Sequence, residues 1–210
     1  MSNNQPWERR RGMLLAVAAP SGAGKTTLCV RMTELFDDLR YAISYTTRKP
    51  REGEVDGEHY HFVDQQRFKE MISQSAFLEW AEVHSNFYGT PKGEVDAMRD
   101  RGTDVLLDLD VQGVETIRSL GTDAVFCLIL PPSFEVLRER LTTRGKDAVE
   151  EVDRRMTIAV KEIARIDLFD YVIVNDDLDE ATRALESIIR AEHARRARVA
   201  DDWFRGTFLS

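Results

Sequence analysis

The chain has 210 residues, 42% of them hydrophobic and 31% charged, which is the composition of a folded protein with one α/β core and room for inserted subdomains. Its net charge of −8 argues against a nucleic-acid polymer as the main partner, although a local group of arginines would still bind a small phosphorylated ligand. No apolar run approaches the ~20 residues of a membrane span, and neither Cys29 nor Cys127 has a neighbouring Cys or His for a metal, so we expect a cytoplasmic protein with buried thiols.

Apolar runs and helical spacing of apolar residues predict strands that alternate with helices. Strands are expected at residues 13–19, 103–109, 123–130 and 171–174, and helices at 25–36, 65–75, about 134–143 and 178–199, with Ser133 as the N-cap of the third helix. Short polar segments rich in turn formers occupy the stretch from about 41 to 93, which is typical of an inserted, partly β subdomain. This order predicts an α/β fold in three layers, with a parallel sheet between helices.

A glycine-rich loop follows the first predicted strand. Residues 19–26 read A-P-S-G-A-G-K-T, which fits the phosphate-loop pattern except that Ala19 stands where glycine is usual. Gly22 and Gly24 let successive N–H groups point at phosphate oxygens, Lys25 brings a positive charge to the β- and γ-phosphates, and the Thr26 hydroxyl reaches a magnesium ion. The predicted ATP-binding residues in this loop are Ser21, Gly22, Ala23, Gly24, Lys25, Thr26 and Thr27.

Acidic residues stand at the end of the second predicted strand. Asp108 and Asp110 follow the apolar run at 103–107, where the carboxylate of a Walker-B element lies in such folds. Since side chains alternate along a strand, both are expected on the same face. We therefore predict that Asp108, through a water molecule, and Thr26 hold Mg²⁺.

The region between these two motifs carries a more specific signal. Residues 44–60 read S-Y-T-T-R-K-P-R-E-G-E-V-D-G-E-H-Y, and F-L-E-W at 77–80, N-F-Y-G-T at 86–90, L-D-L-D-V-Q-G at 107–113 and I-V-N-D-D at 173–177 follow. Over residues 13 to 192 the chain resembles guanylate kinase. The resemblance implies a P-loop kinase core (13–43, 95–133 and 166–192), a GMP-binding insertion (44–94) and a helical lid (134–165), and it leaves a basic and aromatic tail at 193–210. It also implies ATP and Mg²⁺ as cofactors, and GMP and dGMP as acceptors.

The resemblance assigns the acceptor site residue by residue. It places Arg48, Arg51, Tyr60 and Tyr88 on the GMP phosphate, and Ser44, Glu79, Thr90 and Asp110 on the rest of the nucleotide. Arginine suits phosphate because its planar fork donates paired, charge-assisted hydrogen bonds. Glu79 suits guanine because a carboxylate accepts from both N1–H and the N2 amino group, whereas adenine presents a lone pair at N1.

The resemblance also assigns a closing lid over the donor. Arg140, Arg144 and Arg155 match arginines that close over the phosphates, and with Lys25 and Arg48 they form the predicted catalytic set; Asn175 matches a position near the adenine of ATP. Such cations stabilise charge that develops on the transferred group. The predicted reaction is direct in-line transfer without a general base, because the acceptor phosphate is already an anion.

Three alternatives remain beside this interpretation, and oligomeric state is left open. A P-loop kinase for another phosphorylated acceptor would not need the set Ser44, Glu79 and Thr90. A catalytically silent, guanylate-kinase-like binding module would lack Lys25 or the lid arginines. A switch GTPase would carry an N-K-x-D element, which the sequence does not contain.

Overall fold

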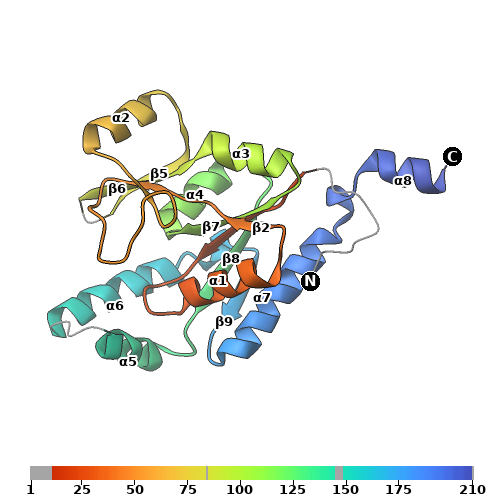
Figure 1. Cartoon of the computed structure of the whole chain (residues 1–210). Coiled ribbons are helices and arrows are strands. Elements are labelled where there is room, and N and C mark those ends of the chain that lie inside the picture. The colour runs from red at the N-terminus through yellow and green to blue at the C-terminus, as the bar shows by residue number, and fades with distance from the viewer. Residues whose placement is uncertain (1–10, 84, 145–148, 210) are drawn as a thin grey trace.

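A computed structural model describes residues 11–83, 85–144 and 149–209, with only the main chain of residue 144 (Figure 1). Its centre is a parallel sheet in the order β2-β7-β1-β8-β9. These strands are β1 (Leu14–Ala18), β2 (Leu39–Tyr41), β7 (Asp104–Leu109), β8 (Val125–Leu130) and β9 (Tyr171–Val174). The four predicted strands and their parallel order are confirmed. The edge strand β2 was not predicted, because three residues are too few to show a pattern.

Helices cover both faces of this sheet, which gives the predicted three layers (Figure 1). The helices α1 (Lys25–Leu35) and α7 (Leu178–His193) pack on one face, and α3 (Lys92–Asp100) and α4 (Val111–Ser119) on the other. In β1, Leu15 and Val17 point to the first pair, and Leu14 and Ala16 to the second. Every residue of β1 is buried, which explains why the strand is a continuous apolar run in the sequence. Burial of each leucine contributes about 2 kcal/mol to the free energy of folding.

A second, mixed sheet lies beside the carboxyl ends of β1 and β7. It has the order β4-β3-β6-β5 and consists of β3 (Tyr45–Thr46), β4 (His61–Phe62), β5 (Phe77–Val83) and β6 (Asn86–Pro91). Helix α2 (Gln65–Ser73) covers it through Phe68, whose ring lies 4.5 Å from Phe77 and 5.4 Å from Phe87 between centroids. Gly89 permits this packing, since a Cβ there would lie 2.8 Å from the Phe77 ring. A partly β region was predicted here.

Two further helices form a small unit with its own core. They are α5 (Phe134–Arg144) and α6 (Val149–Ile163), and the short helix η1 (Ile166–Leu168) follows them. Leu137 and Leu141 of α5 pack on Val152 and Ala159 of α6. Ser133 begins α5 as predicted, because its Oγ accepts a hydrogen bond of 3.2 Å from the Val136 N–H.

The C-terminal segment differs from the expected single helix. The prediction that the last helix runs to residue 199 was wrong: α7 ends at His193, and η2 (Arg196–Arg198) and α8 (Asp201–Phe208) follow. Helix α7 stops there because its end is held by buried polar groups. His193 is fully buried against Asp104 at 2.5 Å, and Arg198 pairs with Asp123. Helix α8 then extends away from the rest of the chain (Figure 1).

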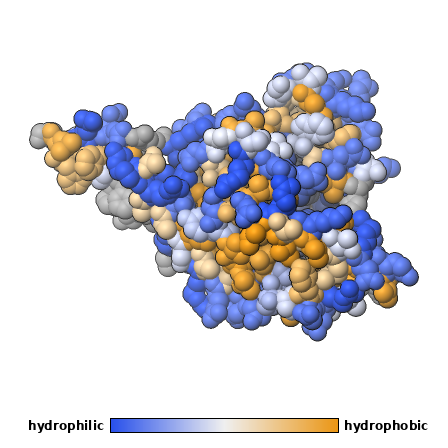
Figure 2. Space-filling view, turned by 180° about the vertical axis from the view of Figure 1, so that it is seen from behind, coloured by the Kyte–Doolittle hydropathy of each residue, from blue (hydrophilic) through white to orange (hydrophobic). Residues whose placement is uncertain are grey.

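The two cysteines and the surface can be compared with what the composition predicts. Cys29 and Cys127 are free and buried, as expected. Within the described ranges, no helix is both long and apolar enough to cross a membrane. Seen from behind, an apolar area lies at the surface (Figure 2), and the edge strand β9 exposes Val172 and Val174.

Candidate active site

The glycine-rich loop joins β1 to α1 and forms a phosphate cradle. Gly22 and Gly24 have φ of +93° and +95°, a region that residues with a Cβ rarely adopt. A Cβ on Gly24 would also overlap the side-chain amide of Asn175, which donates a 2.7 Å hydrogen bond to the carbonyl of Ala23. Among the described non-glycine residues, only Ser75 and Ser85 have a positive φ. The backbone at Ala19 therefore does not require glycine.

Lys25 is held at the carboxyl end of the central sheet. Its Nζ donates to the carbonyl oxygen of Leu109 at 2.6 Å and forms an ion pair with Asp108. Asp108 accepts a second hydrogen bond, of 2.9 Å, from the Tyr41 hydroxyl. The loop lysine and the carboxylate at the strand end thus lie side by side. Tyr41 was not foreseen, because its role depends on β2 lying next to β7.

Oxygen donors suited to magnesium lie next to this lysine. The Thr26 hydroxyl and the Asp108 carboxylate line one cavity. Among the described residues, no cluster of three or more His, Cys, Asp or Glu could enclose a metal ion. Two hard oxygen donors fit Mg²⁺, which keeps several waters and takes further ligands from substrate phosphates.

The cavity, of about 510 Å³, lies between the two sheets. The predicted site residues in its wall are Lys25, Thr26, Ser44, Tyr60, Glu79, Tyr88, Asp108 and Asp110. Asp110 is the N-cap of α4, with its Oδ1 accepting from the Gly113 N–H at 2.8 Å. Of the residues predicted to bind the acceptor, Arg48, Arg51 and Thr90 are not in the wall.

Glu79 stands in β5, lines this cavity and is only 7% exposed. Thr90, opposite it in β6, is fully buried and donates a 2.5 Å hydrogen bond to its Oε1. Helix α4 approaches closely at Gly113, where a Cβ would lie 3.0 Å from Oε2. Burial raises the pKa of Glu79 to about 7, and the nearby charge of Asp110 adds to the rise although the Thr90 hydrogen bond opposes it. Thr90 therefore supports the carboxylate rather than reaching the cavity itself.

Arg48 is occupied by an internal partner. Its Nη1 and Nη2 donate to the two carboxylate oxygens of Glu54 at 2.9 and 2.8 Å, and the Arg51 main-chain N–H donates to Glu54 at 2.7 Å. The guanidinium lies 5.5 Å from the centroid of the Tyr60 ring. Glu54 lines the cavity, whereas the two arginines do not. Glu54 was not predicted as a site residue. No sequence pattern shows that its carboxylate would bind Arg48.

Helices α5 and α6 approach the phosphate loop and Asn175 beside it. Arg140 of α5 donates a 3.0 Å hydrogen bond to the Asn175 carbonyl, and Arg155 of α6 donates to the Ser21 hydroxyl. The side chain of Arg144 lies outside the described part. A second cavity, of about 500 Å³, opens between α5 and this loop. Its wall consists of Gly22, Gly24, Thr27, Val136, Glu139, Arg140, Thr143, Asn175, Asp176 and Leu178.

Glu162 of α6 is a further acidic residue near this centre. Burial raises its pKa, the positive charge of Lys25 opposes the rise, and the negative charge of Asp110 adds to it. The charges of Lys25 and Asp110 therefore lie close enough to Glu162 to act on it. Glu162 was not among the predicted site residues.

Comparison with known proteins decides the family. The family model described as guanylate kinase matches residues 11–192. The chain belongs to the guanylate kinase family. It is 47% identical over 189 residues to a guanylate kinase of Carboxydothermus hydrogenoformans, with 90% of this chain and 93% of that protein covered. A guanylate kinase of Geobacter sulfurreducens is 46% identical, with 92% and 95% covered.

A solved structure gives the same result. The crystal structure of guanylate kinase from Anaplasma phagocytophilum superposes with a TM-score of 0.76 at 30% sequence identity. The match covers 97% of this chain and 98% of that one. The predicted family and fold are therefore confirmed across nearly the whole guanylate kinase chain.

Proposed function

We propose that this guanylate kinase transfers the γ-phosphoryl group of ATP to GMP, and also to dGMP, yielding ADP and GDP or dGDP. The observation that carries the proposal is the buried carboxylate of Glu79, which lies in the same cavity as Lys25 and Asp108. An acceptor base at one end and a reacting phosphate at the other fit a single nucleotide in this cavity. We further propose the cytoplasm as the site of action.

On the donor side, the loop from Ser21 to Thr27 binds the triphosphate with its main-chain N–H groups. Lys25 exchanges its contacts with Asp108 and the Leu109 carbonyl for the β- and γ-phosphates. Thr26, and Asp108 through a water molecule, would hold Mg²⁺, which would neutralise phosphate charge. Asn175 lies beside the second cavity, where the adenine is expected.

On the acceptor side, Glu79 accepts hydrogen bonds from N1–H and the N2 amino group of guanine, while Thr90 fixes the carboxylate and Ser44 contacts the base. Adenine would leave this carboxylate facing a lone pair, and an unsatisfied buried acceptor of this kind costs about 1–3 kcal/mol. The phosphate is assigned to Arg48, Arg51, Tyr60 and Tyr88, and Asp110 is assigned to the acceptor nucleotide.

The transfer itself needs positioning and charge stabilisation rather than acid–base chemistry. The acceptor oxygen is already anionic, so an in-line attack requires no side chain as general base. Arg140, Arg144 and Arg155 stabilise charge on the transferred group and, with the lid, exclude water that would hydrolyse ATP. We assign the core, insertion and lid to residues 13–43 with 95–133 and 166–192, to 44–94 and to 134–165.

A coupled assay of ADP release tests this function. GMP, dGMP, AMP, CMP and UMP are compared as acceptors at equal concentrations, with Lys25→Met as the inactive control. GMP and dGMP are expected to give turnover well above the others. Equal rates with AMP would refute the assignment of Glu79 to guanine, and full activity of the Lys25 variant would remove that lysine from the reaction.

A further inference from the structure

The arginine expected to hold the acceptor phosphate already holds an anion of the protein itself. Both oxygens of the Glu54 carboxylate accept from the Arg48 guanidinium, and one of them also accepts from the main-chain N–H of Arg51. These are the donors that an anionic phosphate group would use. The side chains of the pair are only 14% and 17% exposed, so water screens them little.

The position of Glu54 relative to the cavity is decisive. Glu54 lines the cavity together with Tyr60 and Tyr88, whereas Arg48 does not. The carboxylate therefore stands between the Arg48 fork and the space in which the acceptor nucleotide would lie. The loop that carries it turns at Gly53, where φ is +84° and a Cβ would meet no atom within 4 Å. Open space therefore lies beside the turn that carries Glu54.

From this arrangement we infer that Glu54 is a placeholder anion, a carboxylate that occupies the acceptor-phosphate site until the phosphate of GMP displaces it from Arg48. The inference rests on the proposed function. Charge balance explains the arrangement: a guanidinium withdrawn from water keeps a counter-ion at every stage, first the carboxylate and then the phosphate. GMP binding then includes the free energy of breaking an internal ion pair, so Glu54 lowers affinity for the phosphate and leaves base recognition unchanged.

Glu54→Gln tests the inference, with isothermal titration of GMP and of guanosine as the two measurements. The amide keeps the size and one acceptor of the side chain but removes the charge that competes with phosphate. We expect GMP to bind about fivefold more tightly, because no internal ion pair has to break. Guanosine, which carries no phosphate, should bind with unchanged affinity.

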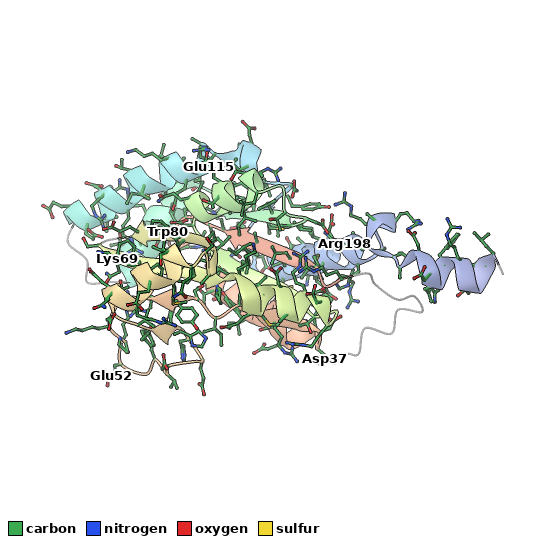
Figure 3. All side chains as sticks on the ribbon, turned by 90° about the horizontal axis from the view of Figure 1, so that it is seen from above. Asp37, Glu52, Lys69, Trp80, Glu115 and Arg198 are labelled. Atoms are coloured by element: carbon green, nitrogen blue, oxygen red, sulfur yellow. The ribbon has the colours of Figure 1, made fainter. Side chains whose placement is uncertain are left out.

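Glu52→Gln is the matched control. Glu52 is exposed and lies in the same loop, at the outer edge of the molecule (Figure 3). Its substitution by glutamine changes the net charge by the same amount as Glu54→Gln. GMP affinity should stay unchanged in this variant. Thermal unfolding of both variants checks that each one is folded.

The outcomes separate the inference from the function on which it rests. Tighter GMP binding in Glu54→Gln alone supports the placeholder. Weaker GMP binding in a folded Glu54→Gln protein overturns it and makes Glu54 a positioning residue for Arg48. If Glu52→Gln binds GMP more tightly by the same factor, the effect comes from net charge alone, and the inference is overturned as well. In either case the proposed function stands as long as the wild-type protein phosphorylates GMP. If wild-type protein neither binds nor phosphorylates GMP, the function and the inference both fail.

Discussion

The Glu79→Gln substitution separates what the buried carboxylate does for binding from what it does to stability. Burial raises the pKa of Glu79 from 4.5 to about 7. At about 1.4 kcal/mol per pH unit, this rise corresponds to a penalty of about 3 kcal/mol for ionising the side chain in the unliganded protein at pH 8. Because the folded pKa is raised, the unfolded state ionises first as the pH increases from 4.5. The protein therefore loses stability between pH 4.5 and about 7.

Glutamine removes the ionisation and keeps an oxygen that accepts from Thr90. We expect Glu79→Gln to lose less stability than the wild type between pH 5 and 8, and its free energy of unfolding to exceed that of the wild type at pH 8 by up to about 3 kcal/mol. GMP should nevertheless bind more weakly to the variant, because the amide accepts from only one of the two guanine donors at a time. Urea unfolding at pH 5, 6, 7 and 8 measures the first effect and titration of GMP at pH 8 the second.

Wild-type GMP binding should depend on pH for the same reason. Affinity should rise with pH up to about 7 and then level off, and binding near pH 6 should release a proton, visible as a dependence of the binding enthalpy on the buffer.

Glu82→Gln is the matched control, since Glu82 lies in the same strand and is exposed. If Glu79→Gln and the wild type lose stability in parallel over this range, the burial argument is refuted.

Substitutions at three further positions test the supports around the site. Thr90→Val removes the 2.5 Å hydrogen bond to Glu79 and should raise the pKa of that carboxyl further, shifting the pH profile of GMP affinity to higher pH, whereas Thr90→Ser should preserve it. Gly24→Ala should abolish ATP binding in a titration, because a Cβ at φ +95° overlaps the Asn175 amide; normal ATP affinity would contradict the cradle geometry. Arg155→Ala should lower kcat about 10²-fold and leave the KM for GMP unchanged, and a change confined to KM would speak against its assignment to the transferred group.

The parts of the fold that the sequence revealed are those with a strong local pattern. The strand at Leu14–Ala18 is buried on both faces and therefore apolar throughout. Helix α3 (Lys92–Asp100) was missed because it buries only Val95 and Arg99, which leaves too few apolar positions to mark a period. Helix α4 buries Val111, Val114 and Ile117, but Gly113 in its first turn weakened the signal. Helix α6 was expected only through the resemblance, as part of the helical lid at 134–165.

In the candidate site, too, the residues in local motifs were predictable and the others were not. The glycine loop and Glu79 were predictable, because a phosphate cradle and a guanine-reading carboxylate need particular residues at particular places in the motifs. The partners of Arg48 and Asp108 were not. Glu54 and Tyr41 reach them only after the loop at 51–57 folds back and β2 pairs with β7. Contacts of this kind depend on tertiary structure, and no local spacing encodes them.

The fate of the γ-phosphate tests the central claim most directly. The protein is incubated with ATP labelled in the γ-phosphate, GMP and magnesium, and the nucleotides and the protein are separated and counted. We predict that the label leaves ATP only in the presence of GMP and appears in the β-phosphate of GDP, with none on the protein. Label released as inorganic phosphate at the same rate without GMP, or retained on the protein, would contradict it.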